Sequence, residues 1–207
     1  MPKSGTSGEP VAENAAQREH VYEELFGEVQ EVFPEAGSLV PQIEVRKYHR
    51  MWMAKKTTVL VTSGMSDARM KMSKVAKGIS PRAELVFYCT DPCENYVEAL
   101  RQLARFPHDN RTWLYFGHTI PNGDPPAPFW GSKILNTALF SPPVVKRDQA
   151  LPEKLILGGD AVNFLWVVPV STAECELKLQ KGFPAVLELF NTHQHPFVFD
   201  PSRPSYV

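Results

Sequence analysis

The first strongly patterned segment of the chain has apolar residues at helical spacing. Pro10 suits the first turn of a helix, and Pro34 and Gly37 end the pattern. Because the apolar positions form a single stripe, we expect one long amphipathic helix packed on a sheet. The stripe consists of Val21, Tyr22, Leu25, Phe26, Val29, Val32 and Phe33.

Later segments have the pattern of strands. Some alternate apolar with polar residues, and others are short β-branched or aromatic runs bounded by turn residues. A glycine turn at 158–160 joins 154–157 to 161–170 in an expected hairpin. The remaining predicted strands are 42–49, 57–62, 82–89 and 135–140.

Capping signals predict the other helices. Residues 91–94 offer an N-cap and a proline for a helix that we expect to end at Pro107. Residues 171–174 form a capping box for another helix, which Gly182 ends, and 184–190 form one more.

The pattern as a whole predicts an α+β fold with a mixed β-sheet flanked by about four helices. Neither an internal repeat nor a shift in composition marks a second domain, so we assign one domain to 10–207 and a flexible, Gly/Ser-rich tail to 1–9. A chain of 207 residues can bury a substantial core without disulfides or a structural metal.

Charge and composition narrow the classes of function. The chain has 22 basic and 23 acidic residues, a net charge of −1, so we expect no general attraction to nucleic acid or anionic lipid. No apolar run is long enough for a membrane span, and the N-terminus lacks the apolar region of a secretory signal. Three cysteines suit a reducing compartment, which predicts a cytoplasmic protein.

A glycine-containing turn follows the predicted strand 57–62. Ser63 and Met65 flank Gly64, but the Gly-x-Ser-x-Gly pattern of a nucleophile elbow is absent. The segment therefore indicates a tight structural turn, with a binding loop as the alternative.

The segment 107–128 is expected to be a loop, and it is unusually rich in polar and aromatic residues for a connector. We expect a turn at Asp109, a carboxylate partner for Arg111 and inward packing of Trp113. The segment is either a hydrogen-bonding hub or a surface for a ligand or partner. Its other candidate binding residues are His108, His118 and Asn122.

No metal site or cofactor is expected. Zinc needs three or four ligands at characteristic spacing, which His108 and His118 do not supply. Cys89 and Cys93 are weak evidence for a zinc site for the same reason. His193 and His195 would lie on one face of a predicted strand, but they lack further metal ligands. No phosphate-binding glycine loop is present. At the C-terminus, Phe197 and Phe199 are expected to anchor an extended segment that carries Arg203.

In their joint order, several of these stretches resemble the suppressor-of-fused family. The matching segments run from about residue 40 to the C-terminus of the chain. They are 61–66, 82–86, 107–114, 117–123, 165–170, 174–179 and 199–201.

The resemblance implies an α+β protein that is not an enzyme and binds another protein. Animal members grip an extended peptide of a transcription factor by strand addition between two domains, of which this chain resembles the N-terminal one. Single-domain bacterial members resemble immunity proteins or antitoxins, so we expect a partner that is a toxin. The expected partner-binding residues are loop residues: Ser63, Met65, His108, Asp109, Arg111, His118, Asn122 and Arg203.

Two other functions stay open at this point. One is a regulatory scaffold that sequesters a transcription factor or another cytosolic client. The other is an enzyme centred on His108, Asp109 and His118. The oligomeric state is not predicted by the sequence.

Overall fold

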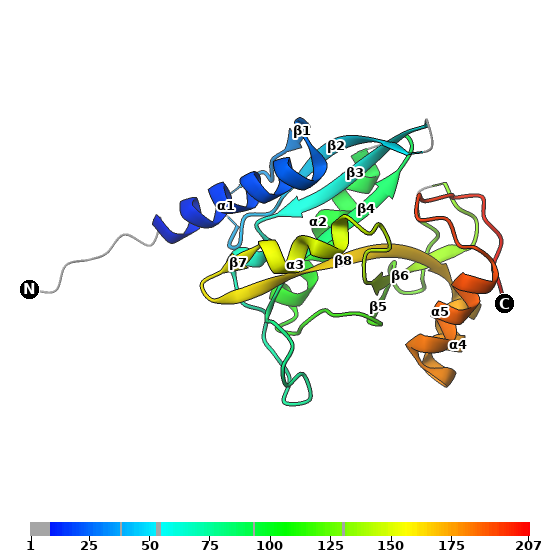
Figure 1. Cartoon of the computed structure of the whole chain (residues 1–207). Coiled ribbons are helices and arrows are strands. Elements are labelled where there is room, and N and C mark those ends of the chain that lie inside the picture. The colour runs from blue at the N-terminus through cyan, green and yellow to red at the C-terminus, as the bar shows by residue number, and fades with distance from the viewer. Residues whose placement is uncertain (1–8, 38, 53–54, 93, 130) are drawn as a thin grey trace, which may run out of the picture.

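The computed structural model describes residues 9–37, 39–52, 55–92, 94–129 and 131–207, which build a mixed sheet covered by helices (Figure 1). The strand order is β1-β2-β3-β4-β8-β6-β5, with β7 paired to β8 beside this path. The strands are β1 (Val29–Phe33), β2 (Glu44–Trp52), β3 (Lys55–Ser63), β4 (Arg82–Cys89), β5 (Thr119–Pro121), β6 (Leu135–Ser141), β7 (Ile156–Leu157) and β8 (Asp160–Ser171).

The pair β4 and β8 is parallel, and the other pairs are antiparallel. The helices are α1 (Glu9–Phe26), α2 (Glu94–Asp109), α3 (Leu151–Lys154), α4 (Thr172–Lys181) and α5 (Phe183–Thr192), with 3-10 turns η1 (Met65–Asp67) and η2 (Asp148–Ala150). The predicted α+β class with a mixed sheet is confirmed.

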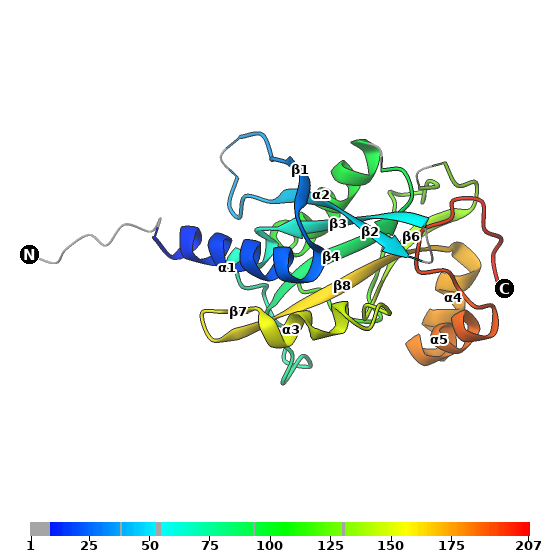
Figure 2. The same cartoon turned by 45° about the horizontal axis from the view of Figure 1, so that its top comes forward.

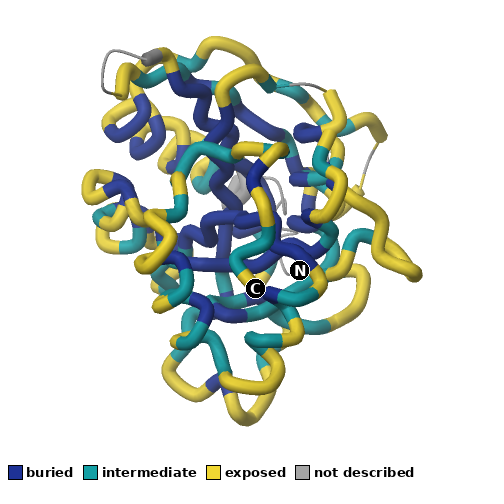
Figure 3. The backbone as a smooth tube through the Cα atoms, turned by 90° about the vertical axis from the view of Figure 1, so that its right-hand side faces the viewer, coloured by how far each residue is buried: buried dark blue, intermediate teal, exposed yellow. Residues whose placement is uncertain are grey.

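Helices cover both faces of the sheet, as two separate cores show. On β8, Phe164 and Trp166 belong to the core under α1 and α3, whereas Leu165 and Val167 belong to the core under α2. This alternation follows from the two-residue period of a strand. Figure 2 shows α1 and α3 on one side of the sheet and α2 on the other. In Figure 3 the buried residues concentrate along the sheet, and the connecting loops are exposed.

The first helix is shorter than predicted. It ends at Phe26, and Gly27, with φ 89°, donates its N–H to Glu23 O at 2.9 Å. The left-handed conformation that glycine allows turns the chain, and Val29–Phe33 becomes an edge strand paired with β2. The prediction of one helix to Phe33 was wrong because the apolar positions of this strand happen to continue the helical spacing.

Two other local predictions were wrong. Helix α2 continues through Pro107 to Asp109, because a proline in the last turn removes one donor while Asn110 N still bonds Phe106 O at 3.0 Å. His193 and His195 follow the end of α5 in a turn and not on a strand. Their rings stack on Tyr206 and Phe190, respectively.

Most of the other predicted elements are confirmed. The apolar run 82–89 is β4, the glycine turn joins β7 to β8, and Ser171 and Glu174 form the capping box of α4. Of the predicted tail 1–9, only Glu9 lies within the described residues, where it begins α1. Among the described residues, no helix combines the length and apolarity that crossing a membrane requires.

Candidate functional site

The turn after β3 is organised by a buried carboxylate. Glu84 on β4 accepts hydrogen bonds from the N–H groups of Gly64 and Ser66 at 3.0 Å each and from the hydroxyls of Ser66 and Thr62 at 2.6 Å each. A Cβ at residue 64 would lie 2.0 Å from Gln42 O, so the turn requires glycine there. The predicted tight structural turn is confirmed.

Ser63 belongs to the same buried network. Its hydroxyl accepts from Arg18 Nε at 3.1 Å, and the Arg18 guanidinium also contacts both carboxylate oxygens of Asp67. Arg18 Nε lies 4.0 Å from Glu84 Oε1, too far for a hydrogen bond. Complete burial raises the pKa of Glu84, against the opposing effects of Arg18 and the hydroxyl donors.

Met65 and His108 meet beneath this turn. The Met65 side chain is fully buried, and the His108 Nε2 atom lies 3.1 Å from Met65 O. Burial lowers the pKa of His108, which favours the neutral imidazole. The expectation that Ser63 and Met65 belong to a surface loop was wrong, because Arg18 and the α2 core cover them.

Asp109 and Arg111 are exposed where α2 ends. Arg111 has a left-handed backbone, with φ 49°. The expected carboxylate partner of Arg111 is not found among the residues that the structure describes, whereas Trp113 packs against the core as predicted. Asp109 and Arg111 therefore remain available to a partner, because neither side chain forms an ion pair or a hydrogen bond within the described part of the chain.

Arg203 is buried and was wrongly expected on a surface loop. Its guanidinium donates to the two carboxylate oxygens of Glu174 at 2.7 and 2.8 Å and to Pro169 O at 2.9 Å. Tyr206 packs over the Arg203–Glu174 ion pair, with its ring centroid 4.6 Å from Arg203 Cζ. This ion pair fastens the C-terminal segment to α4 and β8, so Arg203 serves the fold.

His118 and Asn122 flank β5, the terminal strand of the sheet. Phe140 N donates to His118 O at 3.0 Å, and Asn122 N donates to Asn136 O at 2.8 Å. Because backbone groups alternate along an antiparallel ladder, the N–H and C=O of Thr119 point away from β6. Neither group has a hydrogen-bond partner among the residues that the structure describes, so this outward pair can bond to another chain.

An apolar hollow of about 220 Å³ lies beside β5, against α2. The side chains of Ile120 and Phe129 line it from the β5 side, and Leu103 and Phe106 line it from α2. Asn122 closes the following loop by donating its side-chain amide to Ala127 O at 2.8 Å. A strand laid along β5 would have its alternate side chains next to this hollow.

The other edge of the sheet is less open to pairing. Arg101 on α2 donates to Phe33 O and Pro34 O at 3.2 Å each, and Glu31 on β1 forms an ion pair with Lys47. Charged side chains on an edge strand discourage the addition of another strand. The edge at β5 is thus the better candidate for binding an extended segment.

A larger hollow, of about 580 Å³, lies between α1 and the segment before β2. Its charged side chains are already paired: Arg18 with Asp67, and Arg46 with Glu19 and Glu44. Among the described residues, no group of three or more His, Cys, Asp and Glu side chains is placed to hold a metal ion. Cys93 lies outside the described residues, and Cys89 is buried.

A family model settles the relationship that the motifs suggested. The model described as "Suppressor of fused protein (SUFU)" matches residues 44–204. The chain belongs to the suppressor-of-fused family. The predicted resemblance is therefore confirmed. No curated protein gives a significant match to the chain.

Solved structures of SUFU proteins have the same fold. A SUFU homologue from Neisseria gonorrhoeae FA 1090 matches with a TM-score of 0.71 and 16% identity, over 95% of this chain and 98% of that one. A crystal structure of the Sufu–Fu complex matches with a TM-score of 0.62 and 13% identity, over 95% and 92%. Drosophila Suppressor of Fused matches with a TM-score of 0.60 and 13% identity, over 98% of this chain but 54% of that protein.

Neither the burial of Glu84 nor the ion pair of Glu174 was predicted from the sequence. Glu84 had a detectable signal, since it interrupts an apolar strand in which a charged residue needs a partner. Glu174 was recognised for its capping box, but its second partner, Arg203, is 29 residues away. Arg18 precedes Val21 and Tyr22 of the predicted apolar stripe by three and four residues, so the helical spacing places it on the inward face, but the spacing does not indicate its partners.

Proposed function

We propose that this SUFU-family chain is a non-enzymatic protein-binding domain that captures an extended segment of its partner along β5. The observation that carries the proposal is the outward-facing N–H and C=O of Thr119 on the terminal strand. The apolar hollow next to Ile120 adds a place for a partner side chain. Family membership supports this function, because a SUFU fold has been solved in a protein complex, Sufu–Fu.

The shortness of β5 favours binding of one specific partner over binding of many different extended segments. β5 has three residues, and Pro121 lacks an N–H, so the free edge offers one complete donor–acceptor pair. Such an edge resists pairing with arbitrary strands. A partner needs additional contacts, for which His118 and Asn122 flank the edge and Asp109 and Arg111 lie exposed nearby in the sequence.

A matched pair of substitutions at one position tests strand addition. Thr119→Pro removes the outward N–H, whereas Thr119→Val keeps it with a side chain of similar size. We expect Thr119→Pro to weaken partner binding about tenfold or more, because a backbone hydrogen bond and the strand geometry are lost. Thr119→Val should bind as the unchanged chain does.

The measurement is capture of proteins from the native host by the tagged full chain, with mass spectrometry and then titration of the purified partner. Melting curves confirm that both variants fold. If Thr119→Pro binds as well as Thr119→Val, the partner does not add a strand at β5. If the unchanged chain retains no stoichiometric partner, protein binding itself is contradicted.

Within this function, we propose that the partner is a toxin that the chain neutralises as an immunity or antitoxin-type protein. The match over 98% of the Neisseria homologue's chain supports a bacterial type of SUFU architecture. Co-expression with toxins encoded near the gene should restore growth of the host cell, and the Thr119→Pro variant should restore it less. Binding to a non-toxic cytosolic client, with no protection against any of those toxins, would instead favour a regulatory scaffold.

A further inference from the structure

The connection between η1 and β4 concentrates positive charge in a chain of nearly balanced composition. Residues 68–81 include Arg69, Lys71, Lys74 and Lys77 and contain no acidic residue. The whole chain has a net charge of −1. The basic loop, as we call residues 68–81, is thus a local feature that the overall charge conceals.

The basic loop projects from the body of the protein and is held at its base. In Figure 1 it is the long teal-green loop at the bottom of the view. Its ends are joined by a hydrogen bond of 2.8 Å from Met70 N to Pro81 O, and Leu114 N contacts Met70 Sδ at 3.4 Å. Ala76 is buried within the loop and takes part in two of its turns. The loop is therefore a defined projection with a fixed root.

Three of its cations lack an acidic partner in the described part of the chain. Arg69 pairs with Asp160 at 3.1 Å, but Lys71, Lys74 and Lys77 are exposed and form no ion pair with any residue that the structure describes. Between two of these lysines, Val75 is 84% exposed. Unpaired lysines on one projection produce a positive potential that the molecule does not neutralise.

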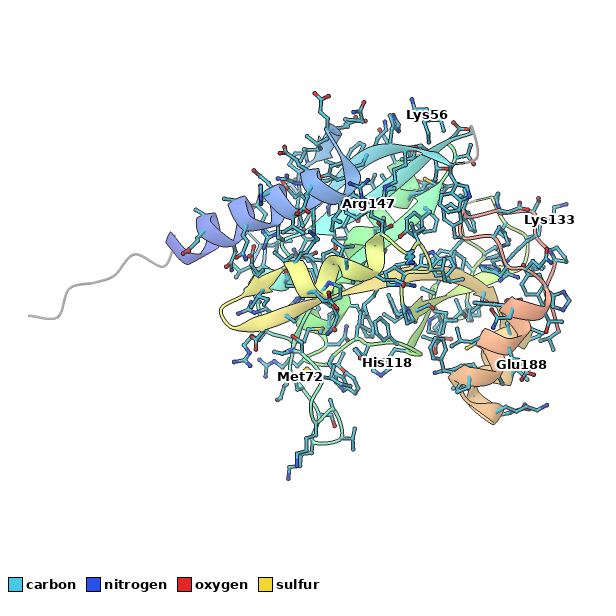
Figure 4. The ribbon with its side chains drawn as sticks, viewed as in Figure 1. Lys56, Met72, His118, Lys133, Arg147 and Glu188 are labelled. Carbon is cyan, nitrogen blue, oxygen red and sulfur yellow. The ribbon has the colours of Figure 1, made fainter. Side chains whose placement is uncertain are left out.

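The root of the basic loop lies next to the segment that leads into β5. Met70 contacts Leu114, and Met72 packs against the same core as Trp113. The Trp113 ring lies 4.4 Å from the His118 ring. In Figure 4, Met72 and His118 appear on the same, lower side of the molecule. A partner bound at β5 can thus reach the loop.

We propose that the basic loop binds an acidic segment of the protein partner, with Lys71, Lys74 and Lys77 as its contact residues. This inference rests on the proposed protein-binding function. Charge complementarity calls for an anionic partner, and two of the three anionic classes lack support in the loop. Nucleic acid is disfavoured because the loop has no aromatic residue for stacking and its one arginine is already paired. A membrane surface is disfavoured because Val75 alone offers too little apolar area for insertion.

The test uses the full chain and a fluorescein-labelled octaglutamate peptide, measured by fluorescence anisotropy. The loop variant is Lys71→Glu, Lys74→Glu and Lys77→Glu together. The matched control changes three exposed, unpaired lysines elsewhere: Lys56→Glu, Lys133→Glu and Lys146→Glu, two of which Figure 4 labels. Both variants have the same net charge, so a difference between them reports position.

We expect the loop variant to bind the peptide about tenfold more weakly than the unchanged chain, and the control to stay within about threefold. Binding should also weaken as salt rises from about 50 to 300 mM, because the lysines are exposed. No binding, or equal weakening in both variants, overturns the proposal. The proposal is also overturned if the chain binds phosphatidylserine vesicles or a short DNA duplex more tightly than the peptide. Binding of the loop to a second copy of the chain would overturn it as well.

The captured partner separates this proposal from the one about β5. If Thr119→Pro abolishes capture and the loop variant does not, partner binding stands and the acidic contact is contradicted. If the loop variant alone loses the octaglutamate peptide but no protein partner exists, the anion-binding loop stands and the protein-binding function fails. Loss of the partner with both variants supports both proposals.

Discussion

Glu84 and Glu174 are both fully buried, and each carboxylate gathers donors from segments that are distant in the sequence. Around Glu84, the direct donors are the neutral N–H and hydroxyl groups of Thr62, Gly64 and Ser66. Around Glu174, Arg203 supplies two charged hydrogen bonds, and the N–H groups of Ser171 and Tyr206 supply two more.

The difference in donors reverses the direction of the pKa shift. Burial raises the pKa of Glu84, and its donors do not overcome that effect. Burial also disfavours the ionised form of Glu174. The bidentate contact with Arg203 and the hydrogen bonds from neighbouring N–H groups outweigh this effect and lower the pKa of Glu174. A full set of hydrogen bonds thus satisfies a buried carboxylate, while a directly paired arginine also keeps it charged.

The largest effect is expected from breaking the charged pair at the C-terminal end. Arg203→Met should lower the free energy of unfolding by about 3–5 kcal/mol at neutral pH, because it leaves the Glu174 carboxylate buried without its counter-charge. Urea denaturation followed by circular dichroism measures the loss. A loss under about 1 kcal/mol would mean that Glu174 does not depend on this pair.

A smaller loss is expected from the matching change near Glu84. Arg18→Met removes the contacts with Asp67 and Ser63, yet Glu84 keeps its four hydrogen bonds from neutral donors. We expect a decrease of about 2 kcal/mol in the free energy of unfolding. The same denaturation experiment compares the two arginines directly. Equal losses in Arg18→Met and Arg203→Met would remove the distinction between the two sites.

The two regions also differ in how far the sequence predicts them. The capping box of Ser171 and Glu174 was predicted because all its groups lie within one turn of chain. The burial of Arg203 was not, because its partner lies 29 residues away and an arginine near a terminus has no local pattern that indicates burial. Local hydrogen bonding is encoded in spacing, whereas a buried ion pair depends on how the elements pack.

The same limit applies at the β3 turn and at β5. The tight turn at Gly64 was predicted from composition, but Ser63 and Met65 are inward-facing because Arg18 and α2 cover them, which the turn itself does not determine. His118 and Asn122 were expected in a loop-like stretch, but the strand β5 runs between them. That they flank a terminal strand depends on the order of the sheet, which no spacing in the sequence indicates.

The smallest but most discriminating effect is the pH dependence of Glu84. In Glu84→Gln, the amide oxygen still accepts from Gly64 and Ser66 and no buried charge remains, so we expect a loss of about 1 kcal/mol at neutral pH. The raised pKa means that the folded state binds the Glu84 proton more tightly than the unfolded state does. The stability that Glu84 contributes is therefore fully present below the unfolded pKa, near 4.5, and declines as the pH rises through the folded value.

The unfolding free energy of the unchanged chain, minus that of Glu84→Gln, should accordingly decrease as the pH rises from acidic to neutral. For Glu174, whose pKa is lowered, the corresponding difference for Glu174→Gln should increase over the same range, because its contribution is lost on acidification. Urea titrations at a series of pH values measure both slopes, and subtracting each variant cancels the titration of groups that interact with neither glutamate. Slopes of the same sign would mean that the four neutral donors stabilise the ionised form of Glu84 as well as Arg203 stabilises that of Glu174. The charge of the donor would then not explain the difference between the two sites.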